Sequence, residues 1–233
     1  MTGIFKKIKL LRKGFLTKYF KLHYSQFGED ITLKELLKDN LNNGFYVDVG
    51  CFHPKKHSNT FFLYKRGWRG INIDLEHEKI YLFKLLRPKD ENIVAAIAME
   101  EKEVTARIFN DYGLGTTLNP DLIKDQEVIK EIKLKSKTLT SVISETRYKN
   151  RQIDILSIDA EGMDFEVLKS LNMEIYKPKI VLVESHENKI ENILKSDLYI
   201  FMCKNGYFLR SWNFYTLIFV VNNCNITKIR DRN

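Results

Sequence analysis

The chain has 233 residues, and its 44% hydrophobic and 29% charged composition is typical of a globular protein and disfavours wholesale disorder. Lys and Arg outnumber Asp and Glu by 38 to 30, but seven of the basic residues lie in residues 1–24. The remainder of the chain is therefore nearly neutral, and a nucleic-acid partner is not expected. The longest apolar runs are far shorter than the ~20 residues that cross a bilayer.

Residues 1–24 are predicted to form a basic amphipathic helix. Apolar residues recur there at steps of three and four, at Ile4, Ile8, Leu11, Phe15, Tyr19 and Leu22. Most of the basic residues fall on the opposite face. Two interpretations remain open: the helix packs on the body with a solvated basic side, or residues 1–22 contact an anionic membrane surface.

From residue 25 onward, helices and strands are predicted to alternate. Buried strands are expected at 45–50, 71–74, 92–98, 153–159 and 179–184. Helices are expected at 25–39, 58–64, 79–86, 140–146, 165–170 and 190–204. Exposed β segments at 105–110 and 132–138 flank a loop at 111–120, and 207–211 and 216–221 form a hairpin around 212–215.

This alternation predicts an α/β fold with a doubly wound, mostly parallel sheet and a C-terminal antiparallel hairpin. The expected divisions are the helix at 1–24, one domain at 25–224 and a tail at 225–233. Ligands of such sheets bind beyond the carboxyl ends of the strands, where the strand order reverses. The strand ends are therefore the places to look for chemistry.

The first two strands end in a pattern that favours a nucleoside cofactor. The turn Asp48-Val49-Gly50 has one glycine, so it lacks the glycine-rich loop that cradles a pyrophosphate. S-adenosylmethionine carries no phosphate and suits such a turn. Asp74 ends the second strand, where a carboxylate can accept hydrogen bonds from both ribose hydroxyls. The alternative is that Asp48 and Asp74 only cap the helices that follow.

Several runs in order carry a family resemblance: Ser25–Asp30, Phe45–Gly50, His53-Pro54, Ser58–Thr60, Gly67–Ile73 and Ile153–Asp164. Together they resemble the FkbM family of S-adenosylmethionine-dependent methyltransferases, over residues 24–221. The resemblance implies a class I methyltransferase (Rossmann-like) fold with a seven-stranded sheet. The cofactor contacts expected on this basis are Asp48, Gly50, Cys51, Asn59, Asp74, Ala96 and Asp159. Cys51 and Phe52 depart from the small residues that many members carry.

The later strand ends carry candidates for the methyl-transfer chemistry. Asp159, Glu161 and His186 are the predicted catalytic residues, because a hydroxyl nucleophile needs a base or a metal ion to remove its proton. The same three residues are candidate ligands of a divalent cation. The expected substrate contacts are His53, Asp164, Glu184 and Trp212, and residues 111–120 are a candidate lid. Each residue also has a structural alternative, such as Asp164 capping the helix after it.

The expected function is S-adenosylmethionine-dependent O-methylation of a hydroxyl, in keeping with the family resemblance, which points to a sugar of a surface glycan or its precursor. The alternatives are an RNA-directed methyltransferase and a non-catalytic cofactor-binding module; the missing glycines disfavour a nicotinamide enzyme. Three scattered cysteines without a C-x-x-C pair are typical of the reducing cytoplasm. The expected location is therefore cytoplasmic, with peripheral contact at the inner face of the membrane.

Overall fold

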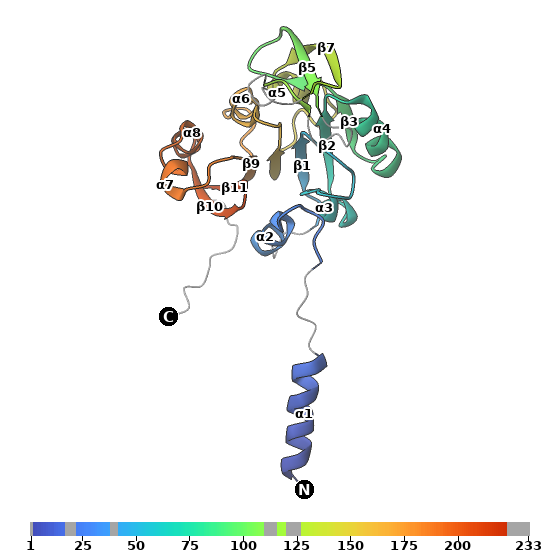
Figure 1. Ribbon diagram of the computed structural model, residues 1–233, viewed down its shortest axis with the longest axis vertical. Helices are drawn as coiled ribbons and strands as arrows, with labels where there is room; N and C mark the ends of the chain where they lie inside the picture. The colour runs from blue at the N-terminus through green and yellow to red at the C-terminus, as the bar shows by residue number, and fades with distance from the viewer. Residues whose placement is uncertain (1, 17–21, 38–41, 110–115, 120–126, 223–233) are drawn as a thin grey trace.

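The computed structural model describes residues 2–16, 22–37, 42–109, 116–119 and 127–222, and Figure 1 shows their arrangement. The helices are α1 (Thr2–Leu16), α2 (Glu29–Leu36), α3 (Phe61–Lys65), α4 (His77–Leu86), α5 (Leu139–Ser144), α6 (Asp164–Lys169), α7 (Ile190–Ile193) and α8 (Asp197–Lys204). The strands are β1 (Phe45–Val49), β2 (Arg69–Asp74), β3 (Glu91–Val94), β4 (Ala96–Ile97), β5 (Glu103–Ile108), β6 (Thr116–Thr117), β7 (Lys130–Lys137), β8 (Ile155–Ile158), β9 (Ile180–Glu184), β10 (Tyr207–Asn213) and β11 (Thr216–Val221).

In the described residues, seven strands form the main sheet in the order β3-β2-β1-β8-β9-β11-β10. The pairs from β3 to β9 are parallel, while β11 pairs antiparallel with both β9 and β10. The predicted doubly wound sheet with an antiparallel hairpin is thereby confirmed. The chain builds outward from β1 to β3 and then returns to β8 on the other side of β1. The strand order therefore reverses between β1 and β8, where a ligand site is expected.

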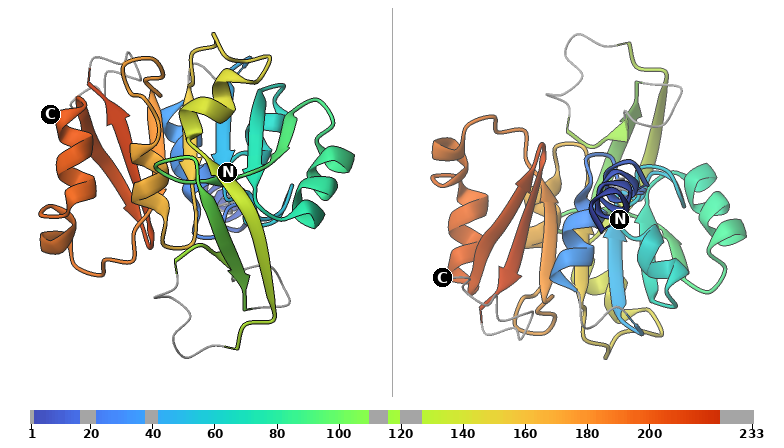
Figure 2. Two further views of the ribbon diagram at one scale, coloured as in Figure 1. Left: turned by 90° about the horizontal axis from the view of Figure 1, so that it is seen from above. Right: turned by 90° about the horizontal axis from the view of Figure 1, so that it is seen from below.

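Helices cover both faces of this sheet because the side chains of each strand alternate between the faces. On β1, Phe45 and Val47 belong to a core shared with α5, α6 and α8, while Tyr46 belongs to a core shared with α2 and α3. Figure 2 shows α5 and α6 on one side of the sheet and α2 on the other. All five residues of β1 are buried, as a strand covered on both faces requires.

Two predicted elements are each divided in two in the structure. The run at 92–98 is two strands, because the chain leaves β2 after Val94 and β4 pairs with β7 instead. Strands β4 and β7 form a second sheet together with β5 and β6, in the order β4-β7-β5-β6. The helix at 190–204 is broken into α7 and α8, since Ser196 caps α8 by accepting the Tyr199 N–H at 3.2 Å. The candidate lid falls mostly on residues 110–115 and 120, and the tail on 223–233, which lie outside the described residues.

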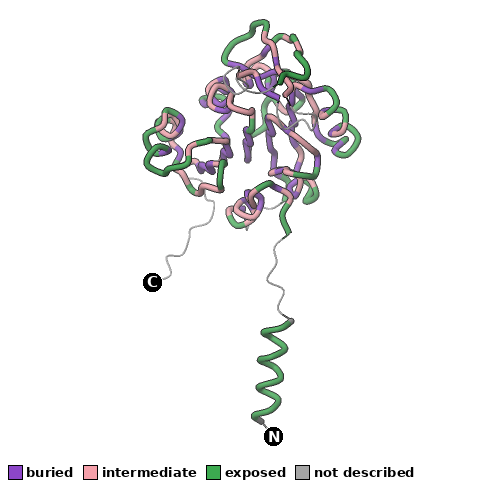
Figure 3. Tube along the Cα trace, viewed as in Figure 1, coloured by how far each residue is buried: buried purple, intermediate pink, exposed green. Residues whose placement is uncertain are grey.

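Helix α1 ends at Leu16 and stands apart from the α/β body (Figures 1 and 3). Residues 3–15 are all exposed, including Phe15 at 84% and Ile4 at 65%. Its apolar face is thus not covered by the body in this structure. Among the described residues, no helix is both long and apolar enough to cross a membrane.

Candidate active site

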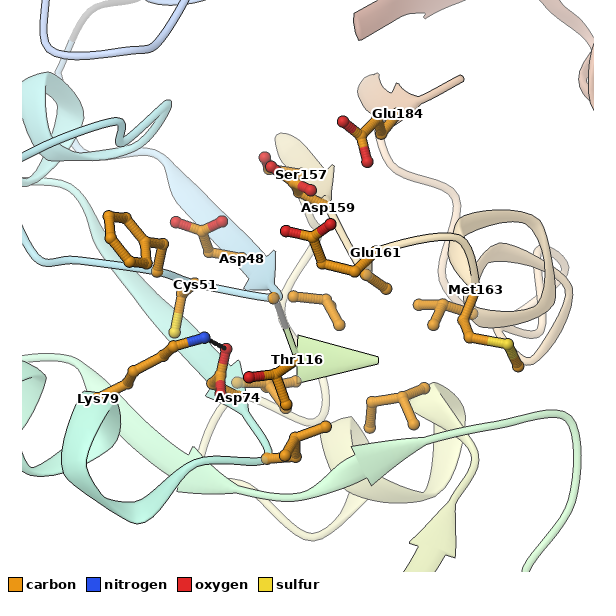
Figure 4. A pocket seen from close by; sticks show the side chains of 18 of the residues that line it. Asp48, Cys51, Asp74, Lys79, Thr116, Ser157, Asp159, Glu161, Met163 and Glu184 are labelled. Atoms are coloured by element: carbon orange, nitrogen blue, oxygen red, sulfur yellow. Dashed lines mark hydrogen bonds and ion pairs between the residues drawn. The ribbon is translucent and has the colours of Figure 1, made fainter. Parts of the chain in front are cut away.

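A pocket of about 380 Å³ opens at the reversal point, beyond the carboxyl ends of β1, β2 and β8. This volume falls in the ~300–1,000 Å³ range of small-molecule sites. Figure 4 shows Asp74 and Lys79 at one end, and Asp159, Glu161 and Glu184 toward the other. The predicted cofactor contacts all line this pocket: Asp48, Gly50, Cys51, Asn59, Asp74, Ala96 and Asp159.

The Asp74 end of the pocket has the shape and chemistry of an adenosine site. Apolar side chains line it next to the Asp74 carboxylate: Leu75, Phe83, Ala96, Ile97, Met163 and Val167. Asp74 lies at the end of β2 and accepts the Glu76 backbone N–H at 2.8 Å. A planar base fits between apolar walls, and the carboxylate can accept from ribose hydroxyls. The residues present therefore fit the nucleoside part of S-adenosylmethionine.

The turn after β1 is built without a phosphate cradle. The Gly50 and Cys51 N–H groups both donate to the Ile73 carbonyl, at 2.9 and 3.2 Å, so neither is available to an anion. Gly50 has φ +76°, and a Cβ there would lie 1.6 Å from the Asp159 carbonyl oxygen. The glycine is thus required by the close approach of the chain to itself, rather than by the cofactor alone.

A buried arginine fixes the loop that follows this turn. Arg87 is 0% exposed and donates to the Pro54 carbonyl, to Ser58 Oγ at 2.7 Å and to Thr60 Oγ1 at 2.8 Å. Thr60 Oγ1 in turn donates to Asp48 at 2.6 Å. Burial raises the pKa of Asp48 to about 6, and the Thr60 bond and the Arg87 charge oppose that rise. Sequence reasoning missed Arg87, which holds Asp48 and the pocket wall in place.

Carboxylates crowd the other end of the pocket. Asp159 follows β8, Glu161 lies two residues on at φ +45°, and Glu184 ends β9. Burial, reinforced by the charges of Asp159 and Asp164, raises the pKa of Glu161 to about 7. Burial and the Asp159 charge raise the pKa of Glu184 far above its usual range, so Glu184 is protonated at neutral pH.

Asp159 is the partner of this protonated acid. The Asp159 side chain is exposed to the solvent in the pocket. Desolvation by the surrounding protein nevertheless raises the pKa of Asp159, and a hydrogen bond from Glu184 and the His186 charge oppose this rise. The two neighbouring carboxyl groups titrate as one coupled pair, because each disfavours the charge of the other. The pair therefore offers a carboxylate of raised basicity to a ligand in the pocket.

The structure places the other predicted residues as follows. His186 lies at the pocket rim, with Nε2 3.6 Å from Glu184 Oε2 and its ring 5.6 Å from that of Tyr215. His53 lines the pocket, but its Nδ1 accepts the Lys55 and Lys56 N–H groups, each at 3.0 Å.

Two predicted substrate contacts do not line the pocket. Trp212 packs against the main core and donates through Nε1 to the Phe214 carbonyl. Asp164 is buried, and its carboxylate accepts the N–H groups of Ala160 at 2.7 Å and Gly162 at 3.1 Å. The alternative raised from the sequence, that Asp164 caps the helix after it, is not what the structure shows: Asp164 is the first residue of α6, Met163 is its N-cap, and no side chain of the described residues caps the helix. The Asp164 carboxylate instead binds the loop before α6.

The pocket also has lining residues that sequence reasoning did not assign to it: Gln26, His57, Lys79, Thr116 and Ser157. Ser157 could have been predicted from the sequence, because it precedes Asp159 by two residues in the same predicted strand. In the structure its Oγ accepts a hydrogen bond from Asn59 Nδ2 at 3.2 Å. Gln26 lies in the first run of the family resemblance. Thr116 has no local signal, since it reaches the pocket only through the second sheet.

The carboxylates close enough to share an ion differ from those predicted. Among the described residues, Asp159, Asp164 and Glu184 form the group of possible ligand atoms within 4.8 Å of one another. Glu161 and His186 are not part of that group. Asp164 is already engaged by two backbone N–H groups. Crowded acids alone are common without a metal ion.

The parallel strand order, which reverses between β1 and β8, and the pocket beyond the strand ends define a Rossmann-like α/β protein that binds a ligand at this edge of the sheet. A family model described as the methyltransferase FkbM domain matches residues 48–209. The chain belongs to this FkbM methyltransferase family.

The other comparisons add little to the family match. Among solved structures, the chain is similar to the crystal structure of a TehB-like SAM-dependent methyltransferase from Corynebacterium glutamicum ATCC 13032 Kitasato. The two share 10% identity with a TM-score of 0.42, over 94% of this chain and 96% of that one. No curated protein matches the sequence.

Proposed function

We propose that the protein methylates a hydroxyl oxygen of a sugar-bearing acceptor, such as a surface glycan or its precursor. The observation that carries this proposal is a pair of neighbouring carboxyl groups: Asp159 and Glu184 both line the pocket, and their oxygens belong to a group of atoms within 4.8 Å of one another. Burial raises the pKa of both. A hydroxyl is a poor nucleophile until it loses its proton, so an O-methyltransferase needs such a base. An amine acceptor has less need of a carboxylate of raised pKa.

The transfer needs little else from the protein. S-adenosylmethionine supplies a methyl group on a good sulfonium leaving group. The acceptor oxygen forms the new bond to carbon, the sulfur keeps the electron pair of the broken bond, and the hydroxyl proton moves to Asp159. The protein's remaining contribution is to hold the acceptor in line with the methyl group and to exclude water.

The chemistry of the rim supports a polyhydroxyl acceptor. Uncharged hydrogen-bonding side chains from separate segments line this end: Gln26, His57, Asn59 and Tyr215. Phe27 stacks on Phe214 with ring centroids 4.7 Å apart and tethers the Gln26 segment to the tip of the β10–β11 hairpin. The carboxylates of the same end would repel phosphates, which disfavours an RNA acceptor.

The decisive experiment is product identification. Extracts from cells with and without the protein are compared by mass spectrometry after incubation with methyl-deuterated cofactor. We expect a deuteriomethyl ether on a sugar, located by fragmentation. A label recovered only on nitrogen or on RNA contradicts the proposal.

The divalent-cation interpretation has its own measurement. Activity is assayed after chelator treatment and then with added Mg²⁺, Mn²⁺ or Ca²⁺. Restored turnover would assign an ion to the Asp159, Asp164 and Glu184 group. Activity that is indifferent to chelator and cation leaves proton transfer to the side chains.

We further propose that α1 binds an anionic membrane surface, placing the enzyme at the inner face near lipid-linked glycans. Its exposed face carries Ile4, Ile8, Leu11 and Phe15, and its polar face carries Lys6, Lys7, Lys9, Arg12 and Lys13. Each basic residue near an anionic surface contributes ~1 kcal/mol. Apolar anchors plus charge are the signature of an interfacial helix.

The membrane proposal predicts selective co-sedimentation with vesicles. We expect the full chain to bind vesicles that contain phosphatidylglycerol, to bind neutral vesicles weakly, and to be released by high salt. The double variant Ile8→Ser and Phe15→Ser keeps every charge and is expected to lose most of the binding. Equal binding of this variant and the wild type would show that the apolar face does not insert.

A further inference from the structure

Lys79 is a half-buried cation at the cofactor end of the pocket. Its side chain is 13% exposed, and Nζ lies 2.8 Å from Glu76 Oε1 and 3.5 Å from Asp74 Oδ2. Figure 4 shows the ammonium group beside Asp74 at the pocket wall. Lys79 lies in α4, five residues after the end of β2. A lysine in such a surface helix ordinarily points into solvent. Its burial here indicates a specific role.

The ammonium group is held in place by residues from two parts of the fold. Thr116, in β6 of the second sheet, donates to Glu76 Oε1 at 2.5 Å, and this is the same oxygen that Lys79 contacts. Lys79 also lies 5.7 Å from the centre of the Phe52 ring. The shorter contact to Glu76 anchors the ammonium group beside Asp74 Oδ2, while Asp74 Oδ1 accepts the Glu76 backbone N–H at 2.8 Å. The carboxylate held in this way lines the pocket.

Burial disfavours the charge of Asp74, and Lys79 is the neighbour that opposes this effect most. Burial raises the pKa of Asp74 to about 6 and the Glu76 charge adds to the rise, while the Lys79 charge and the Glu76 backbone N–H oppose it. Cys51, after β1, and Glu161, after β8, also face this group. Ribose hydroxyls donate to a carboxylate more strongly than to a carboxylic acid, so the ionised form is the one that binds the cofactor.

We propose that Lys79 is a positioning residue for cofactor binding: anchored by Glu76 and Thr116, it keeps Asp74 ionised and oriented to accept the ribose hydroxyls. The lysine acts through Asp74 and does not itself contact the ribose. The role concerns the cofactor alone, so it stands or falls independently of the acceptor proposed above.

The test measures the affinity for S-adenosylhomocysteine by calorimetry between pH 6.5 and pH 9. This product has no sulfonium charge, so removing a lysine does not change its long-range attraction to the site. In Lys79→Met, the pKa of Asp74 rises further, and we expect at least about fivefold weaker binding at pH 7 that recovers as the pH rises to 9. Lys79→Arg keeps the charge and is expected to bind nearly as the wild type does.

Two matched variants complete the design. Lys84→Met removes an exposed lysine of the same helix and is expected to change nothing. Asp74→Asn is expected to weaken binding at every pH without recovery. Thermal unfolding without ligand reports folding, and Lys79→Gln, which can still bond Glu76, is measured in parallel in case the methionine variant unfolds.

The proposal is overturned by either of two results. One is wild-type affinity at pH 7 in the variants without the lysine charge. The other is a loss of affinity that stays the same from pH 6.5 to pH 9, which would assign the lysine a direct contact or a purely structural role.

Discussion

Replacing Asp159 by asparagine is expected to lower kcat at least ~100-fold, because the variant removes the group proposed to take the hydroxyl proton. The affinity for S-adenosylhomocysteine should change little, since the adenosine end is built from Asp74 and its apolar neighbours. In the wild type, kcat should rise with pH through the raised pKa of Asp159, because only the ionised carboxylate is a base. The asparagine variant should lack this rise.

The matched control is Asp197→Asn, which removes an exposed carboxylate at the start of α8 that does not line the pocket. It is expected to keep full turnover. If Asp159→Asn keeps a kcat within tenfold of the wild type, the base is elsewhere. Glu161→Gln and His186→Ala would then be compared, because both residues line the same pocket.

Replacing Gly50 by alanine is expected to lower the free energy of unfolding by at least ~3 kcal/mol and to abolish cofactor binding. Two causes act together. The residue has φ +76°, which L side chains rarely adopt, and the added Cβ would lie 1.6 Å from the Asp159 carbonyl oxygen. The overlap is with backbone, so no side-chain rotation relieves it. Chemical denaturation and calorimetry measure the two effects.

Gly67→Ala separates these causes. Gly67 has φ +91°, but a Cβ there would meet nothing within 4 Å. This variant therefore reports the backbone conformation alone, for which about 1–2 kcal/mol is expected. If Gly50→Ala and Gly67→Ala lower the free energy of unfolding equally, the ends of β1 and β8 can separate easily, and Gly50 does not set the geometry of the site.

The central strands were predictable because burial on both faces leaves a strong sequence pattern. The runs at 45–50 and 153–159 are mostly apolar and end in Gly50 and Asp159, so their burial in the sheet and the site at their ends followed from general rules. The split at Val94 was not predictable. A continuous β run does not encode the point at which the chain moves from one sheet to another.

The candidate site divides in the same way. Residues at strand ends, such as Asp48, Asp74 and Asp159, were found because the fold places them. Lys79 was missed because helical spacing treats it as a surface residue, and its burial depends on Glu76 and on Thr116 from the second sheet. Asp164 was predicted as a substrate contact, but it does not line the pocket, and its carboxylate accepts two N–H groups of the loop before α6.

The position of β11 has a consequence for how the protein is made. This last strand lies inside the sheet, between β9 and β10, rather than at its edge. During synthesis the edge of β9 therefore stays unpaired until residues 216–221 have left the ribosome. An open edge of buried, apolar sequence is a template for aggregation. Slow translation or early termination after β10 is therefore expected to lower the yield of soluble protein, even though the residues of the pocket up to His186 have already been made.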